Sequence, residues 1–424
     1  MSSPIQIHER RAPDADAIRS IEGTPSAWKQ LGLEEKRRLL EQLLRDRKGN
    51  EPPIKEGSAS STAPAARRVP KGKIDFSLLF FSSNERDESS EKYDLLLQAS
   101  QLADRLGFRA VWIPERHFHP VGGLFPNPSV VAAALAVLTT NIRLRAGSVV
   151  APLHQPLRIA EEWSVVDNLS NGRVDLSFAR GWNPNDFVLS PGNYSTDNGL
   201  MRAQMDTVRT LWRGESIRLP NPLGKSAEVR IFPRPIQKDL TCWMTCVGGH
   251  ERFKEAAGSG ANILTMLYNQ TIEELGGKIE AYRAVRDTAS GPGVVTLMLH
   301  SFVHPDLDFV RRTVREPFME FIKSTIDLHQ HGAKVRGIDL DEDEKRRTAE
   351  YAYERYFRTA ALFGTPDGCV DIVEKLIAAG IDEVACQIDF GVDRRHALES
   401  IHHLAMLKNL FSAVCPQPAA ASQP

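Results

Sequence analysis

The stretch from Asn141 to Phe187 constrains the fold of this chain more than any other part of the sequence. A β-branched run at 142–150 is followed by a helical pattern that begins at Pro156, and then by a second apolar run at 173–179. Proline is favoured in the first turn of a helix, and the pair Asn171-Gly172 supplies a helix end. Two strands joined by such a helical crossover lie parallel in one sheet. The stretch is therefore a βαβ unit, and sheets of this kind hold ligands in the loops after their strands.

The same alternation of strand and helix patterns runs from Lys73 to the C-terminal part of the chain. Eight strands are predicted, at 74–81, 110–114, 142–150, 173–179, 241–247, 262–267, 294–303 and 383–390. Helical patterns lie between them, for example at 91–107, 128–140, 251–260 and 272–287. A closed (β/α)8 barrel requires strands that are apolar along their length, because each is buried on both faces. The sequence predicts this α/β fold, a TIM barrel with insertions, and an open doubly wound sheet is the alternative.

Residues 1–70 have a different character from the barrel region. Leucines at helical spacing within 31–50 predict one amphipathic helix, and the Pro-, Ser- and Ala-rich segment that follows predicts a flexible linker. The expected organisation is therefore a helix and linker in 1–70, a barrel domain in 71–415 and a disordered tail in 416–424.

Two long segments, 183–240 and 305–360, interrupt the alternation of strands and helices. Insertions after barrel strands commonly form substrate loops. We expect at least one of the two to cover the site.

Charge and composition exclude several classes of protein. Lys and Arg number 53 against 54 Asp and Glu, whereas proteins that bind nucleic acid or anionic membranes carry excess base. No apolar run approaches the ~20 residues that span a bilayer, and the polar, charged N-terminus is unlike a signal peptide. The five cysteines are odd in number and lack the paired spacing of structural zinc sites. These features predict a cytoplasmic protein that binds neither nucleic acid nor membrane.

A glycine pair follows the fifth predicted strand and leads directly into a helix. Gly248-Gly249 places backbone amides at a helix N-terminus where a phosphate can approach closely, and Arg252 follows one turn later. A simple tight turn is the alternative interpretation. Arg180-Gly181, on the loop after another strand, is the companion, since barrels often hold a phosphate between a helix N-terminus and an arginine. Together the two turns favour a phosphorylated cofactor, and Trp182 is a candidate for stacking on its ring.

The loop after the second predicted strand reads PERHFH. Glu115, Arg116 and His117 stand at the carboxyl end of a barrel strand, where side chains meet substrate. His117 is suited to donate or accept a proton near neutral pH. An ion-paired cluster that holds loops together is the alternative. His117 and His119 have the spacing of a metal-binding pair, but no ligand partner other than Glu115 is near them in sequence, so we expect no metal.

Several longer segments resemble a known family, the flavin-dependent luciferase-like monooxygenases. They are PERHFH, NPSVVAAALAVLTTNIRLRAGSVV, PLRIAEEWSVVDNLSNGRVDLSFARGWNPNDF and VGGHERFKEAAGSGANILT. Two further blocks, VTLMLHSFV and ALFGTPDGCVDIVEKLIAAGIDEVACQIDFG, resemble the subgroup found in natural-product biosynthesis. The resemblance covers roughly residues 73–412.

This resemblance implies a barrel that binds reduced FMN at the carboxyl ends of its strands. It implies that the FMN phosphate is held by Arg180, by the amides around Gly181 and Trp182, and by the segment Gly248, Gly249 and Arg252. It also implies that Gly147 and Ser148 pass beneath the flavin ring through a cis peptide bond.

Glu115-Arg116-His117 is similar to the Glu-His-His segment of the light-emitting members of the family. Arg116 departs from that pattern, which makes light emission doubtful but does not exclude oxygenation. We expect His117 to handle a proton and Arg116 to stabilise developing charge.

The function implied is that of a two-component monooxygenase, which receives FMNH2 from a separate flavin reductase and uses O2 as co-substrate. Its substrate is expected to be a small molecule or an intermediate tethered to a carrier protein in natural-product biosynthesis, because the N-terminal helix resembles segments that join megasynthase modules. The resemblance to the luciferase-like monooxygenases also implies a homodimer. The alternatives are an F420-dependent oxidoreductase on the same barrel and a non-catalytic flavin-binding partner subunit.

Overall fold

The structure, a computed structural model, describes residues 71–81, 91–194, 198–268, 270–286, 291–333 and 342–412. The chain divides into two units, Met1–Arg67 and Arg68–Pro424. The predicted N-terminal helix, linker and C-terminal tail lie outside the described residues. Within those residues, no helix combines the length and apolar character needed to cross a membrane.

Eight parallel strands form a closed barrel in the second unit. Each strand pairs with the next along the chain, and the last strand also pairs with the first, so that no edge of this sheet stays open. The predicted (β/α)8 barrel is therefore confirmed, as are all eight predicted strands, and the open doubly wound sheet is wrong. The strands are β1 (Asp75–Leu79), β2 (Ala110–Ile113), β3 (Arg143–Val150), β4 (Val174–Ala179), β7 (Cys242–Thr245), β8 (Asn262–Met266), β9 (Val295–Val303) and β11 (Glu383–Gln387).

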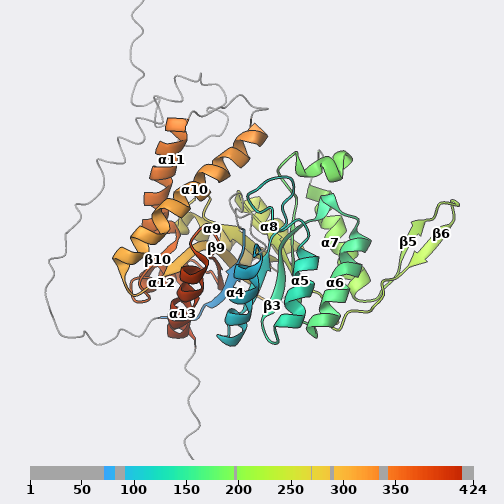
Figure 1. Cartoon of the computed structure of the whole chain (residues 1–424). Helices are drawn as coiled ribbons and strands as arrows, with labels where there is room; N and C mark the ends of the chain where they lie inside the picture. The colour runs from blue at the N-terminus through green and yellow to red at the C-terminus, as the bar shows by residue number, and fades with distance from the viewer. Residues whose placement is uncertain are drawn as a thin grey trace, which may run out of the picture. The chain divides into compact units, whose positions relative to one another are not determined.

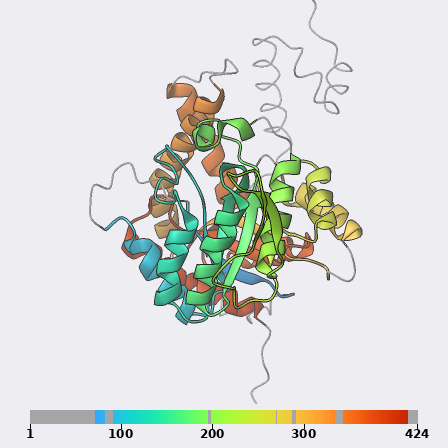
Figure 2. The same cartoon turned by 90° about the vertical axis from the view of Figure 1, so that its right-hand side faces the viewer.

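Helices surround this barrel and bury its outer apolar face (Figures 1 and 2). Helix α6 illustrates how local sequence sets a helix. It begins with Pro156, and it ends at Asn171, which adopts the left-handed conformation and donates its amide to the carbonyl of Asn168. The surrounding helices are α4 (Asp94–Arg105), α5 (Pro128–Leu138), α6 (Pro156–Ser170), α7 (Asn198–Trp212), α8 (His250–Gly258), α9 (Ile272–Val285), α12 (Val370–Ala378) and α13 (Arg394–Phe411).

The two long interruptions contain structure that the sequence patterns did not predict. Segment 183–240 holds α7 and an antiparallel hairpin of β5 (Ile217–Pro220) and β6 (Ser226–Val229), which projects from the barrel in Figure 1. The second segment holds α10 (Leu307–Ala333) and α11 (Glu342–Arg355), which lie side by side. A π-helical turn (Tyr356–Ala360) then leads to β10 (Leu362–Gly364), which pairs with the end of β9.

A buried ion pair network fills the interior of the barrel beneath the carboxyl ends of the strands. The Arg145 guanidinium lies between the rings of Trp112 and Trp243, with centroid distances of 4.8 and 4.4 Å. It also bonds to Asp175 at 2.9 Å and to Glu383 at 2.7 Å. The interior of the barrel is thus occupied by side chains, and in such barrels the site is expected at the carboxyl ends of the strands.

Candidate functional site

Glu115 joins three segments at the carboxyl end of the barrel. Its Oε1 atom lies 2.9 Å from His117 Nε2 and 2.6 Å from His154 Nε2, and its Oε2 atom accepts the amide of Val150 at 2.7 Å. Burial opposes ionisation of this carboxyl, but the hydrogen bonds from the two histidines outweigh burial and hold the pKa of Glu115 below its usual value. Burial likewise acts against the charged form of His154, and the Glu115 carboxylate overcomes it and raises the pKa of His154. Glu115 is therefore an ionised anchor for the loops after β2 and β3.

The side chain of Arg116, the next residue, contacts the segment that follows β4. Its Nη1 atom donates to Asp186 Oδ2 at 2.9 Å, and its guanidinium lies over Trp182 at 5.0 Å and over Phe81 at 5.8 Å. Burial lowers the pKa of Arg116 and raises that of Asp186, although each charge favours the other. The buried Nε atom of Arg116 has no hydrogen-bond partner among the described residues. Asp186 belongs to segment 183–240, so that segment contacts Arg116.

The predicted cis peptide bond between Gly147 and Ser148 is confirmed. A Cβ atom at Gly147 would lie 3.0 Å from the Trp112 ring, so only glycine fits there without displacement of the ring. Ser148 Oγ hydrogen-bonds to Ser177 Oγ at 3.0 Å and to Thr245 Oγ1. Three hydroxyls from β3, β4 and β7 thus meet at one place inside the barrel mouth.

The turn after β4 carries Arg180, Gly181 and Trp182. Gly181 has φ +78°, and a Cβ atom there would lie 2.8 Å from Val150 and 2.9 Å from Phe187. The turn therefore requires glycine, both for its backbone conformation and for the close approach of its neighbours. Arg180 and Trp182 on either side are exposed.

The turn after β7 is the second predicted phosphate site. Gly249 precedes the first residue of α8, and no side chain caps this helix N-terminus. A Cβ atom built at Gly248 or at Gly249 would meet no described atom within 4 Å, so open space surrounds both glycines. Arg252, in the first turn of α8, bonds to Glu255 at 3.1 Å and keeps about a third of its side chain exposed.

The two turns leave neighbouring strands. β4 and β7 pair in parallel, with Phe178 opposite Met244, so the residues that follow both strands lie on the same rim of the barrel. An arginine-bearing turn and an uncapped helix N-terminus thus follow neighbouring strands of the barrel.

His300 on β9 is a polar residue that the sequence analysis did not single out. His300 lies on β9 two residues beyond Met298, which packs against the interior cluster, so strand alternation points His300 inward as well. Four aromatic rings surround its imidazole at centroid distances of 4.7 to 5.8 Å: Phe318, Phe321, Tyr356 and Phe390. Burial lowers the pKa of His300 to about 3, and its Nε2 atom has no hydrogen-bond partner among the described residues. Gln387 Nε2, on the adjacent strand β11, is also buried without such a partner.

The histidines of the H-x-H pattern do not come together as metal ligands. His117 bonds to Glu115, and His119 Nδ1 accepts the amide of Val121 at 3.1 Å. Within the described residues, three potential ligands do gather elsewhere, at His304, Glu399 and His403. However, His304 Nδ1 accepts the amide of Asp306 at 3.1 Å, which places the proton of the neutral ring on the Nε2 atom that faces Glu399. A metal would need the lone pair of that nitrogen.

Comparisons with known proteins show similarity to flavin-dependent monooxygenases. The chain is 24% identical over 344 residues to the oxygenase component of flavin-dependent trigonelline monooxygenase from Acinetobacter baylyi, covering 78% of this chain and 93% of that protein. Among solved structures it is similar to a type II Baeyer-Villiger monooxygenase in complex with FMN, the oxygenating constituent of 3,6-diketocamphane monooxygenase from Pseudomonas putida. That match has a TM-score of 0.61 and 16% identity and covers 78% of this chain and 97% of the other.

The same barrel also carries other chemistry. An F420-dependent secondary alcohol dehydrogenase matches with a TM-score of 0.60 and 14% identity over 80% of this chain and 99% of that one. The sequence model of luciferase-like monooxygenases matches residues 73–383. This match spans most of the chain, and the chain therefore belongs to the luciferase-like monooxygenase family.

Proposed function

We propose that this protein is the oxygenase component of a two-component system, which uses FMNH2 from a separate reductase and O2 to oxygenate a small organic substrate. The observation that carries the proposal is the placement of the Arg180 turn beside the Gly248-Gly249 turn on neighbouring strands. A dianionic phosphate is the ligand that best matches an arginine beside an uncapped helix N-terminus.

The residues present fit FMN. Open space around Gly248 and Gly249 and the N-terminal amides of α8 suit its phosphate, with Arg180 and Arg252 supplying charge. Gly147, which can carry no side chain beside Trp112, lets the backbone of β3 serve as a flat support for the ring. Reduced FMN, when bound, would supply the two electrons that activate O2.

The chain's own residues then have distinct roles. Glu115 holds His117 through the 2.9 Å hydrogen bond to Nε2, which leaves Nδ1 of this ring to accept or release a proton. Arg116 is buried and its Nε atom has no hydrogen-bond partner among the described residues, which suits it to stabilise negative charge. Trp182 and the segment around Asp186 cover Arg116 and keep water from it.

Oxygen uptake tests this proposal directly. Purified protein is mixed anaerobically with FMNH2 and then with buffer saturated with ¹⁸O2, and oxygen consumption and product are followed with a panel of free and carrier-bound substrates. Substrate-dependent incorporation of one atom of ¹⁸O from O2 supports the proposal. No incorporation across the panel, despite bound FMNH2, would contradict it and would point to a non-catalytic flavin-binding subunit.

Hydride transfer with F420 is a second candidate, favoured by the similarity to the F420-dependent alcohol dehydrogenase fold. The two cofactors are distinguished by binding, because titration of the protein with FMN and with F420 under the same conditions shows which one it holds. Reduction of a carbonyl substrate by reduced F420 without O2 would replace the monooxygenase proposal.

The proposal also includes a homodimer. Exposed apolar side chains gather on the neighbouring helices α5 and α6, at Val130, Val137, Leu138, Val165 and Leu169. An exposed apolar patch of this kind supports a homodimer formed through α5 and α6, which Val137→Glu should convert to a monomer in analytical ultracentrifugation.

A carrier-bound substrate in natural-product biosynthesis and a cytoplasmic location complete the proposal. The four described cysteines are free thiols, which suits a reducing compartment.

A further inference from the structure

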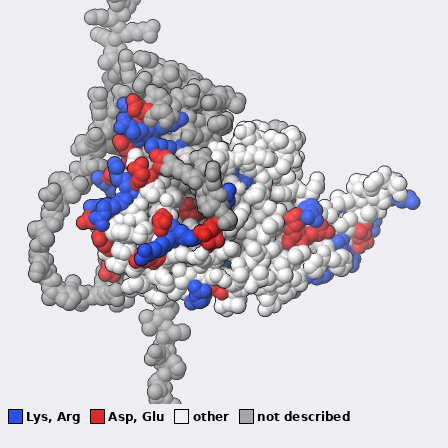
Figure 3. Space-filling view, in the orientation of Figure 1, with Lys and Arg blue, Asp and Glu red and all other residues white. Residues whose placement is uncertain are grey.

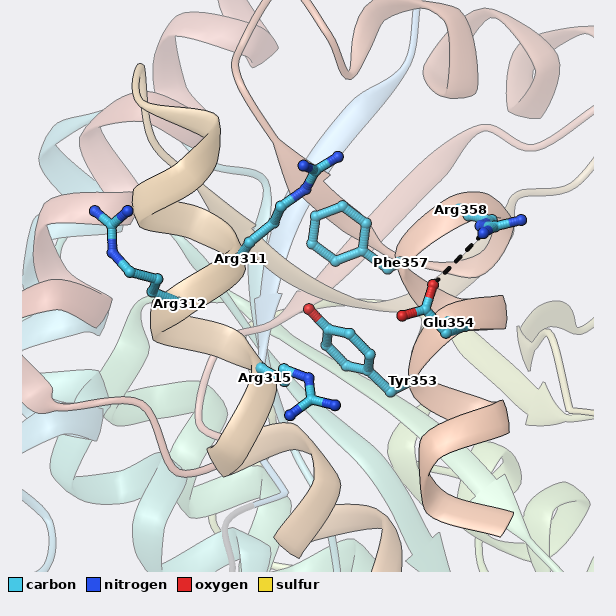
Figure 4. A pocket seen from close by; sticks show the side chains of 7 residues that line it. All are labelled: Arg311, Arg312, Arg315, Tyr353, Glu354, Phe357 and Arg358. Carbon is cyan, nitrogen blue, oxygen red and sulfur yellow. Dashed lines mark ion pairs between the residues drawn. The ribbon is translucent and has the colours of Figure 1, made fainter. Parts of the chain in front are cut away.

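A cavity lies between α10 and α11, in the segment that follows β9 (Figure 4). Its volume of about 460 Å³ is within the range of small-molecule sites. Two helices and the start of the π-helical turn contribute its lining residues, which are Arg311, Arg312, Arg315, Tyr353, Glu354, Phe357 and Arg358.

The lining is strongly cationic. Four of its seven residues are arginines and one is an acid, Glu354, which faces Arg358 at 3.7 Å. Arg311 has one further acidic neighbour, Asp308, at 4.0 Å. These contacts are long and between exposed side chains, so they neutralise little of the positive potential. In Figure 3, basic side chains gather over this part of the molecule, with acidic ones among them.

Two aromatic rings form an apolar wall beneath the guanidinium groups. Arg311 lies 5.7 Å from the ring of Phe357, and Arg315 lies 5.8 Å from the ring of Tyr353. The two rings contact each other at 5.8 Å with a tilt of 45°, so they make one surface and not a slot that sandwiches a ligand. Figure 4 shows Arg311 and Arg315 on the side of α10 that faces these rings, whereas Arg312 projects from the other side of the helix. The cavity therefore combines cationic side chains with an apolar wall of two aromatic rings.

We propose that this cavity binds an organic phosphoester, with the phosphate on Arg311 and Arg315 and the organic part against Tyr353 and Phe357. Guanidinium groups prefer oxyanions and pair with two of their oxygens, and a phosphate offers more charge and more oxygens than a carboxylate. The proposal does not depend on flavin chemistry. The cavity follows β9, whereas the flavin-phosphate turns follow β4 and β7, and β8 separates β7 from β9 in the barrel.

Calorimetric titration of the full chain with phenyl phosphate and with inorganic phosphate tests the proposal. The double variant Arg311→Gln/Arg315→Gln should bind phenyl phosphate at least about tenfold more weakly, a loss of about 1.4 kcal/mol or more. Arg218→Gln on the β5/β6 hairpin removes an exposed arginine elsewhere and should leave binding unchanged. Thermal unfolding verifies that the variants fold. Equal affinity of the double variant and the unaltered protein overturns the proposal.

Two further experiments distinguish binding at this cavity from binding at the turns after β4 and β7. Arg180→Ala should leave the affinity for phenyl phosphate at this cavity intact. If Arg180→Ala abolishes binding and the double variant does not, the phosphate occupies the turns after β4 and β7, and the proposal fails while the flavin assignment stands. Phenyl phosphate should bind more tightly than inorganic phosphate, and Phe357→Ala should remove that difference. Equal affinities for the two ligands would show an anion site without an organic part and would overturn the assignment of ligand class.

Discussion

Glu115 and His154, which stand 39 residues apart in the sequence, are joined by a hydrogen bond of 2.6 Å between Oε1 and Nε2. This bond connects the loop after β2 to the loop after β3 at the rim of the barrel. The same carboxylate oxygen also bonds to His117, the residue expected to transfer a proton. The position of His117 therefore depends on the interaction between Glu115 and His154. Because the pKa values of Glu115 and His154 are shifted in the folded chain, the stability of the fold should change with pH.

The first prediction concerns that pH dependence. The pKa of Glu115 is lowered in the folded chain, so its contribution to stability is present above its unfolded pKa and is lost as pH falls through the folded one. The pKa of His154 is raised, so its contribution is present below its unfolded pKa and is lost as pH rises through the folded one. The pair should thus stabilise the fold most between about pH 4.3 and 6.5.

Glu115→Gln should lower the free energy of unfolding by about 1–3 kcal/mol within that window, because a buried charge-assisted hydrogen bond is lost. The difference should shrink at both ends of the pH range. Urea unfolding at a series of pH values measures it, with His402→Gln on the exposed side of α13 as the control. A difference that stays constant with pH would show that the pair is not ionised.

The second prediction concerns Arg180. Arg180→Ala should weaken FMN binding by about tenfold or more, since one guanidinium contact to a phosphate contributes about 1.5–3 kcal/mol. Quenching of flavin fluorescence measures the affinity. Arg202→Ala, on an exposed position of α7, is the matched control. Unchanged affinity in Arg180→Ala would remove this residue from the phosphate site.

The third prediction compares two glycines. Gly249→Ala adds a methyl group in open space at an ordinary φ of −78°, so the free energy of unfolding should stay within about 0.5 kcal/mol while FMN binding weakens. Gly181→Ala places a methyl group against Val150 and Phe187 at φ +78°, so it should destabilise the fold by about 1–3 kcal/mol. Thermal unfolding and flavin titration of both variants measure these effects. If Gly249→Ala binds FMN normally, the N-terminus of α8 does not hold the phosphate.

The fourth prediction concerns His300. His300→Phe should raise stability by about 1–3 kcal/mol, because it removes a buried nitrogen that has no partner among the described residues and keeps an aromatic ring in an aromatic cluster. The variant should also lose less stability on acidification, since His300 takes a proton at about pH 3 when folded and at 6.5 when not. Turnover should fall if the nitrogen contacts substrate. Reduced stability together with normal turnover would identify His300 as ordinary core.

The sequence by itself determined the barrel and most of what stands on its rim. Hydrophobic runs of strand length alternating with helical periods predict the eight barrel strands and their parallel order, because a barrel strand buried on both faces must be apolar throughout. The positions of Arg180 and Gly248-Gly249 directly after strands predict their place at the carboxyl ends, since strand direction follows from the fold. The cis bond at Gly147-Ser148 came from family resemblance, and the structure bears it out.

Only the tertiary structure decided which side chains meet. The contacts of Glu115 with His154, Arg116 with Asp186 and Arg311 with Phe357 join residues far apart in the chain, and no local pattern encodes such distances. In sequence His300 is one more residue of an apolar strand, and only the fold places four rings around it, from α10, the π-helical turn and the segment after β11. Local sequence sets backbone conformation through short-range sterics and hydrogen bonding, whereas burial, pairing and pKa depend on packing between elements that the sequence brings together only in the folded chain.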